Sequence, residues 1–199
     1  MTDDARHNEK MKRIKTVRDK IQSTKTREGG LLIVHTGNGK GKSTAAFGMV
    51  ARCLGWGMKV GIVQFVKGTW ETGERNFFAR FPDTCLYRTM GEGFTWETQD
   101  RARDVAAARA GWEMACTLMD DPTIQFLLLD ELNIALRYDQ LPIAEVVERL
   151  KSRRSDLHIA VTGRHAKPEL IEAADLVTEM TLVKHPYQAG MKAQRGVDY

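Results

Sequence analysis

The feature that most constrains this chain is a glycine-rich loop between a strand-like run and a helix-like run. Residues 36–43 read Thr-Gly-Asn-Gly-Lys-Gly-Lys-Ser. A short apolar run, residues 31–35, precedes the loop, and a helix-like run, residues 44–54, follows it and ends at Gly55. This order predicts a phosphate-binding loop, because successive glycines let backbone N–H groups converge on phosphate oxygens at a helix N-terminus.

Within the loop, we expect Lys42 to reach nucleotide phosphates as a point charge and the hydroxyl of Ser43 to ligate Mg²⁺ or Mn²⁺. The usual spacing has a glycine where this chain has Thr36. The alternative interpretation is a flexible glycine turn without a ligand. The other expected ATP contacts come from the loop itself: Gly37, Asn38, Gly39, Lys40 and Gly41.

Length and composition are those of an ordinary globular chain. The 199 residues suit one domain with a full core, and 42% are hydrophobic and 28% charged. A net charge of +4 favours anionic ligands or partners. It does not choose between a phosphate-binding enzyme, a nucleic-acid binder and a protein that docks on an acidic partner.

The cysteine pattern and the absence of a long apolar run predict a cytoplasmic protein. The three cysteines, Cys53, Cys85 and Cys116, are widely spaced, which argues against a disulfide framework and a zinc site. No apolar run approaches the roughly 20 residues that span a bilayer. The first residues lack the positive region and apolar core of a signal peptide.

Strand-like and helix-like segments alternate after the loop, which predicts an α/β fold with a mostly parallel sheet and helices on both faces, in a RecA-like P-loop architecture. Strands are expected near residues 59–66, 86–90, 126–129, 158–162 and 176–183. Helices are expected over residues 99–119, from Pro142 to about 153, and over 168–174. Residues 29–199 are expected to form one domain.

The charged segment 1–28 is a separate feature. Met11, Ile14, Val17 and Ile21 make one thin helical stripe. A helix this polar is marginal alone, so the segment is interpreted either as a lid or docking arm or as a solvated tail.

Asp130 ends the apolar run 126–129 and is followed by Glu131. An acid at the carboxyl end of a buried strand, beside a phosphate-binding loop, suits the Walker B carboxylate that holds Mg²⁺. The alternative role for Asp130 is a helix N-cap. Glu131 is expected to orient a water or to bind ribose hydroxyls or metal.

Arg164 and His165 follow another strand end at the same edge. A guanidinium suits phosphate or ribose oxygens, although a surface arginine is an equal alternative. His165 is interpreted as a polar loop residue. Phe94 and Trp96 lie in a glycine-flanked loop that shows neither helical nor strand periodicity. Their rings either fill the core or line a site for a flat apolar ligand.

Together these motifs closely resemble the ATP:corrinoid adenosyltransferases of cobalamin synthesis and salvage, over nearly the whole chain after about Gly29. Ser43 stands where that family usually has threonine, and Asn133 departs from the usual run after the acidic pair. The segments that carry the resemblance are residues 36–43, 64–68, 73–76, 93–98, 129–132, 162–164, 183–185 and 192–194.

The resemblance implies that Co(I) of a reduced corrinoid attacks C5′ of ATP and that inorganic triphosphate leaves. Lys42, the loop amides and Mg²⁺ on Ser43 and Asp130 would stabilise the leaving group. Phe94 and Trp96 would displace the lower cobalt ligand and ease reduction to Co(I). The family also implies a flavodoxin-like reductant and a homodimer, with no nucleic-acid or membrane partner.

Two other functions use the same loop. A nucleotide or nucleoside kinase would release ADP, and a RecA-like ATPase would hydrolyse ATP when DNA is added. Neither calls for the aromatic loop. The sequence leaves open whether the corrinoid is cobalamin, cobinamide or cobyrinic acid a,c-diamide.

Overall fold

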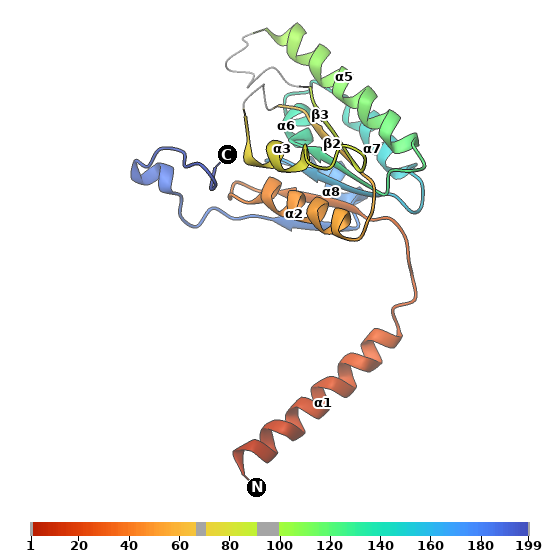
Figure 1. Cartoon of the computed structure of the whole chain (residues 1–199), viewed down its shortest axis with the longest axis vertical. Coiled ribbons are helices and arrows are strands. Elements are labelled where there is room, and N and C mark those ends of the chain that lie inside the picture. The colour runs from red at the N-terminus through yellow and green to blue at the C-terminus, as the bar shows by residue number, and fades with distance from the viewer. Residues whose placement is uncertain (1, 67–70, 91–99, 199) are drawn as a thin grey trace.

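The computed structural model describes residues 2–66, 71–90 and 100–198, and there the chain folds around a six-stranded, wholly parallel sheet (Figure 1). Because the strands run the same way, their carboxyl ends gather at one edge, where α/β proteins bind ligands. The predicted α/β class is confirmed. In spatial order the strands are β3 (Cys85–Thr89), β2 (Val60–Gln64), β4 (Phe126–Asp130), β5 (His158–Thr162), β1 (Leu32–Thr36) and β6 (Leu176–Glu179).

Helices cover both faces of the sheet. On one face lie α2 (Lys42–Gly55) and α3 (Gly73–Phe78). The other face is covered by α5 (Arg101–Asp120), α6 (Leu132–Arg137), α7 (Ile143–Lys151) and α8 (Pro168–Ala173). The core is therefore two apolar layers separated by the sheet.

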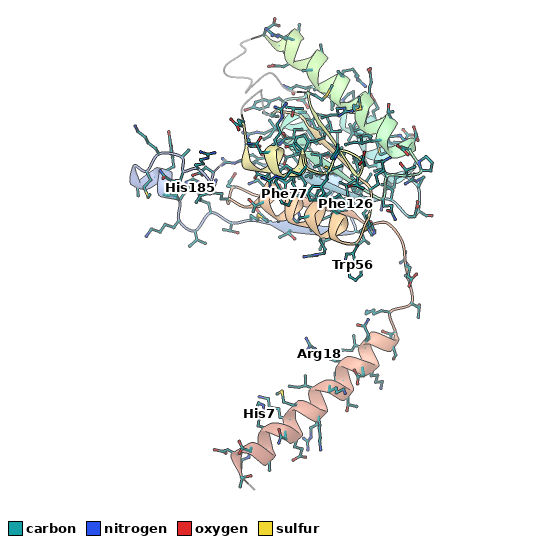
Figure 2. The ribbon with its side chains drawn as sticks, viewed as in Figure 1. His7, Arg18, Trp56, Phe77, Phe126 and His185 are labelled. Atoms are coloured by element: carbon teal, nitrogen blue, oxygen red, sulfur yellow. The ribbon has the colours of Figure 1, made fainter. Side chains whose placement is uncertain are left out.

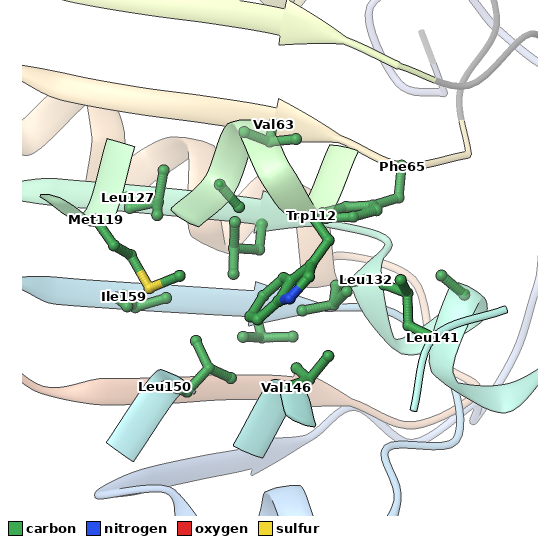
Figure 3. Close-up of a cluster of buried hydrophobic side chains, with 14 of the residues drawn as sticks. Val63, Phe65, Trp112, Met119, Leu127, Leu132, Leu141, Val146, Leu150 and Ile159 are labelled. Atoms are coloured by element: carbon green, nitrogen blue, oxygen red, sulfur yellow. The ribbon is translucent and has the colours of Figure 1, made fainter. Parts of the chain in front are cut away.

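The central strand β4 shows why both layers form. Leu127 and Leu129 enter the larger cluster, whereas Phe126 and Leu128 enter the smaller one. A strand buried on both faces is apolar at every position, as this one is until Asp130. In the larger cluster, Trp112 of α5 packs among strand and helix side chains (Figure 3).

Several element boundaries differ from the sequence predictions. Pro142 is the N-cap of α7 rather than its first residue. The long helix begins at Arg101, because the side chain of Asp100 caps it by accepting from the Arg103 N–H. The last strand ends at Glu179 rather than near residue 183. The sequence predictions did not include α3 and α6, since six residues are too few to show a period.

The N-terminal helix α1 (Asp3–Ser23) stands away from the sheet and its helices (Figure 1). It has no buried residue, and its labelled side chains His7 and Arg18 point into solvent (Figure 2). Its apolar stripe is open, with Met11 41% and Val17 58% exposed. No helix in the described ranges is long and apolar enough to cross a membrane.

Candidate active site

The glycine-rich loop joins β1 to α2 at the carboxyl edge of the sheet. Gly41 is the N-cap of α2 with φ of 110°, a backbone conformation that favours glycine. Lys42, the first residue of α2, is only 7% exposed, and its Nζ donates to the carbonyl oxygen of Gly39 at 2.6 Å. Burial lowers the pKa of Lys42, and the nearby charge of Glu131 opposes that shift. The loop thus curls around its own lysine.

Thr36, which replaces the usual glycine, connects the loop to another part of the edge. Its Oγ1 accepts from the N–H of Ala166 at 3.0 Å. Glycine has no side-chain oxygen that could accept this bond. The hydroxyl therefore holds the segment after β5, which carries Arg164, against the start of the loop.

Two loop glycines are required by close contact with the chain after β6. A Cβ on Gly37 would lie 2.5 Å from the carbonyl oxygen of Met180, and one on Gly39 would lie 2.6 Å from it. The N–H of Gly39 donates to this same oxygen at 2.6 Å. The loop is therefore pressed against the end of the edge strand.

Asp130 is wholly buried at the end of β4, and both its carboxylate oxygens accept hydrogen bonds. Oδ2 accepts from Nε2 of Gln64 at 2.8 Å, and Oδ1 accepts from Oγ1 of Thr162 at 2.7 Å. The hydroxyl of Tyr87 in turn donates to Oε1 of Gln64 at 2.8 Å. These four side chains form a hydrogen-bonded chain across β3, β2, β4 and β5.

Glu131, not Asp130, is the N-cap of α6, so the alternative N-cap role for Asp130 is excluded. Glu131 has φ of 62°, and its N–H donates to Oγ1 of Thr162 at 2.9 Å. Asn133 donates from Nδ2 to the carbonyl oxygen of Gly163 at 2.9 Å. The ends of β4 and β5 are thereby tied together.

A cavity of about 450 Å³ opens in front of the loop and brings together Lys42, Ser43, Glu131 and Arg164. Lysine, arginine and a helix N-terminus around one cavity make an environment for a polyanion. Arg164 is exposed rather than packed. The cavity is lined by residues 39–44, Gly73, Glu74, Glu131, Arg164, His185 and residues 196–198.

The C-terminal segment is part of this cavity, which the sequence did not predict. After β6 the chain passes through a short 3₁₀ helix, η1 (Pro186–Ala189), and returns to the loop (Figure 1). His185 lies at the start of this excursion (Figure 2). At its end, Oδ1 of Asp198 lies 2.5 Å from Nζ of Lys40, and the hydrogen bond from Lys40 lowers the pKa of Asp198.

The predicted aromatic pair, Phe94 and Trp96, lies outside the described residues. Part of the motif at residues 64–68 does too, although its first residue, Gln64, belongs to the chain of bonds around Asp130. Sequence reasoning missed Gln64 and Tyr87 as site residues. The only available signal for Gln64 was its place in a family motif.

These features define a P-loop α/β protein: a glycine loop surrounds a buried lysine at a helix N-terminus, and a buried acid ends a nearby strand. The profile of the family described as ATP:corrinoid adenosyltransferase BtuR/CobO/CobP matches residues 28–199, and that described as cob(I)alamin adenosyltransferase N terminal matches residues 1–21. The chain belongs to the ATP:corrinoid adenosyltransferase family and is an enzyme of this type.

Curated relatives match almost end to end. A corrinoid adenosyltransferase of Pseudomonas aeruginosa is 56% identical, with 98% of this chain and 97% of the relative covered. A corrinoid adenosyltransferase of Escherichia coli K12 is 44% identical, with 98% of this chain and 99% of the relative covered. Among solved structures, the RadB recombinase aligns with 14% identity and a TM-score of 0.46 over 78% of this chain and 77% of that one.

Proposed function

We propose that this enzyme transfers the 5′-deoxyadenosyl group of ATP to the Co(I) of a corrinoid and releases inorganic triphosphate. The electron pair of Co(I) forms the new cobalt–carbon bond. The C5′–O bond breaks, and its pair leaves with the triphosphate. The observation that carries the proposal is the cavity that joins Lys42, Ser43 and Arg164 in a chain of this family.

Because the nucleophile belongs to the substrate, the protein supplies geometry and charge. Lys42 and the amides of residues 37–41 bind the triphosphate as its charge develops. Arg164 contacts phosphate or ribose, and Glu131 contacts ribose hydroxyls or the metal ion. This use of the loop requires C5′, rather than the γ-phosphorus, to face the acceptor.

The donor set fits Mg²⁺ or Mn²⁺. Asp130 is a buried carboxylate, and Ser43 offers a hydroxyl in the first turn of α2, and hard oxygen ligands suit these ions. We assign Ser43 and Asp130 to hold the ion. When bound, it neutralises charge on the leaving triphosphate.

On the corrinoid side, Phe94 and Trp96 are proposed to displace the lower ligand of cobalt, so that reduction to Co(I) becomes easier. Residues 1–28 are proposed to act as a lid over the corrinoid, beside a single domain of residues 29–199. A flavodoxin-like reductant and a homodimer complete the proposal, and cobalamin, cobinamide and cobyrinic acid a,c-diamide are the candidate acceptors.

One experiment separates this function from its competitors. The enzyme is incubated with ATP, Mg²⁺ and a chemically reduced corrinoid, and the phosphate product is identified while the corrinoid spectrum is recorded. Triphosphate together with an alkyl-cobalt spectrum supports adenosyl transfer. ADP with an unchanged spectrum would indicate a kinase or an ATPase instead, and DNA-stimulated phosphate release would identify the ATPase.

A further inference from the structure

The carboxylate of Asp130 is held by side chains from strands on either side of β4. Gln64 of β2 is the direct register partner of Asp130, and Gln64 Nε2 reaches Asp130 Oδ2 at 2.8 Å. Thr162 of β5 bonds the other oxygen at 2.7 Å. The plane of the carboxylate is therefore fixed from both sides.

The amide of Gln64 has a donor end and an acceptor end, and only the donor end suits a carboxylate. The hydroxyl of Tyr87 donates to Oε1 of Gln64 at 2.8 Å, which leaves Nε2 for Asp130. Without that hydroxyl, a flip of the amide would turn Oε1 toward the carboxylate oxygen. The phenol of Tyr87 keeps its proton at neutral pH, and burial raises its pKa further above the ordinary value for tyrosine.

The ring of Tyr87 is itself held by the helix that follows the glycine loop. It stacks on Phe47 of α2, with ring centroids 6.3 Å apart and planes 7° apart. Phe47 also stacks on Phe78 of α3 at 5.5 Å. The hydroxyl thus has a fixed place from which to orient Gln64.

We propose that Tyr87 and Gln64 are positioning residues that orient the Asp130 carboxylate and thereby set the affinity for the divalent metal. This inference rests on the proposed function, in which Asp130 holds Mg²⁺. Tyr87 acts on the ion only through Gln64 and Asp130. Partners of this kind behind a metal ligand commonly change metal affinity by about 10- to 100-fold when removed.

The test measures Mn²⁺ binding to the enzyme–ATP complex by electron paramagnetic resonance, without corrinoid, so that no turnover is involved. We expect Tyr87→Phe, which removes one oxygen, to weaken Mn²⁺ binding about 10-fold. Gln64→Met, of similar size, should weaken it at least as much. ATP binding in the presence of a chelator should remain within about twofold of wild type for both, since neither residue lines the phosphate cavity.

Phe126→Leu is the matched control, because Phe126 lies in the same core layer, at the opposite end of β4 from Asp130, and its side chain takes no part in the hydrogen bonds that link Tyr87, Gln64 and Asp130. It should lower the melting temperature with little change in Mn²⁺ affinity. If Tyr87→Phe and Gln64→Met behave like this control, the residues are merely structural and the inference is wrong.

Asp130→Asn separates the two proposals. If it weakens Mn²⁺ binding strongly while Tyr87→Phe does not, only the positioning role fails. If Asp130→Asn leaves Mn²⁺ binding intact, the metal role of Asp130 fails, and the positioning role fails with it.

Discussion

The ammonium of Lys40, in the glycine loop, lies 2.5 Å from Oδ1 of Asp198, close to the C-terminus. The parallel pairing of β6 with β1 makes this contact possible, because it returns the last part of the chain to the edge where the loop begins. A carboxylate is thereby held beside a cavity proposed to take a triphosphate. The two anions would compete for the same lysine.

Asp198→Asn should therefore strengthen ATP binding. The change removes a negative charge from the cavity wall and releases Lys40, and a gain of about two- to threefold is expected for a partly exposed pair. Calorimetric titration with ATP at low and at higher salt measures the affinity of the variant and of the wild type. The gain in affinity should shrink as salt screens the charges. Weaker binding would mean that the C-terminal segment helps to hold the nucleotide.

Lys42→Ala should weaken ATP binding and reduce adenosyl transfer by roughly 100-fold or more, because the leaving triphosphate loses its buried cation. Binding is measured by equilibrium titration and transfer by the corrinoid spectrum with pre-reduced substrate. Lys151→Ala serves as the control, since Lys151 is exposed at the end of α7 and does not line the cavity, so it should have little effect. Wild-type rates for Lys42→Ala would refute its assigned role.

Thr36→Val keeps the shape of the side chain but removes the acceptor of the Ala166 N–H. The expected cost is about 1 kcal/mol of unfolding free energy, or a melting temperature lower by about 2–4 °C. Thr36→Ser keeps the hydroxyl and is the matched control. A stable Thr36→Val variant with an unchanged melting curve would show that water replaces the hydroxyl.

Changing Phe94 or Trp96 to a small residue should slow turnover from Co(II) more than turnover from pre-reduced Co(I). The reason is that the proposed role of the rings lies in the reduction step and not in the attack on C5′. Parallel assays with the two cobalt states give the ratio directly. Equal losses in both assays would count against this role.

Removal of residues 1–28 should leave the unfolding free energy of the remaining chain and its ATP affinity nearly unchanged, because α1 contributes no buried residue. Corrinoid affinity should fall if the segment is a lid. Denaturant unfolding, ATP titration and corrinoid titration measure the three quantities. Unchanged corrinoid affinity would leave the segment without the role proposed for it.

Local patterns were sufficient to predict the loop and the acid. The loop glycines, Lys42 and Ser43 all lie within a few residues of one another. Asp130 can be recognised because it directly follows an apolar run. The places of both in the fold could be predicted because they depend on neighbours in the sequence. The strands that carry them were predicted for the same reason.

The remaining parts of the site depend on which strands lie side by side. In the sequence, Gln64 is only a polar residue at the end of a strand, and its role depends on β2 lying next to β4. The hydrogen-bond partner of Thr36, Ala166, is 130 residues away in the sequence. The motifs at residues 183–185 and 192–194 carry the family resemblance but do not indicate where the C-terminal segment lies, because its place at the cavity follows from β6 pairing with β1. Sequence periodicity carries no information on these neighbours.

The closeness of Gly37 and Gly39 to the backbone of Met180 has a consequence for mutational scanning of the loop. An alanine at either position would collide with a carbonyl oxygen that belongs to the protein itself. A defect in these two variants will therefore report misfolding of the sheet edge, with or without ATP in solution. Glycine is required at these two positions by the fold itself, whether or not the loop binds a nucleotide.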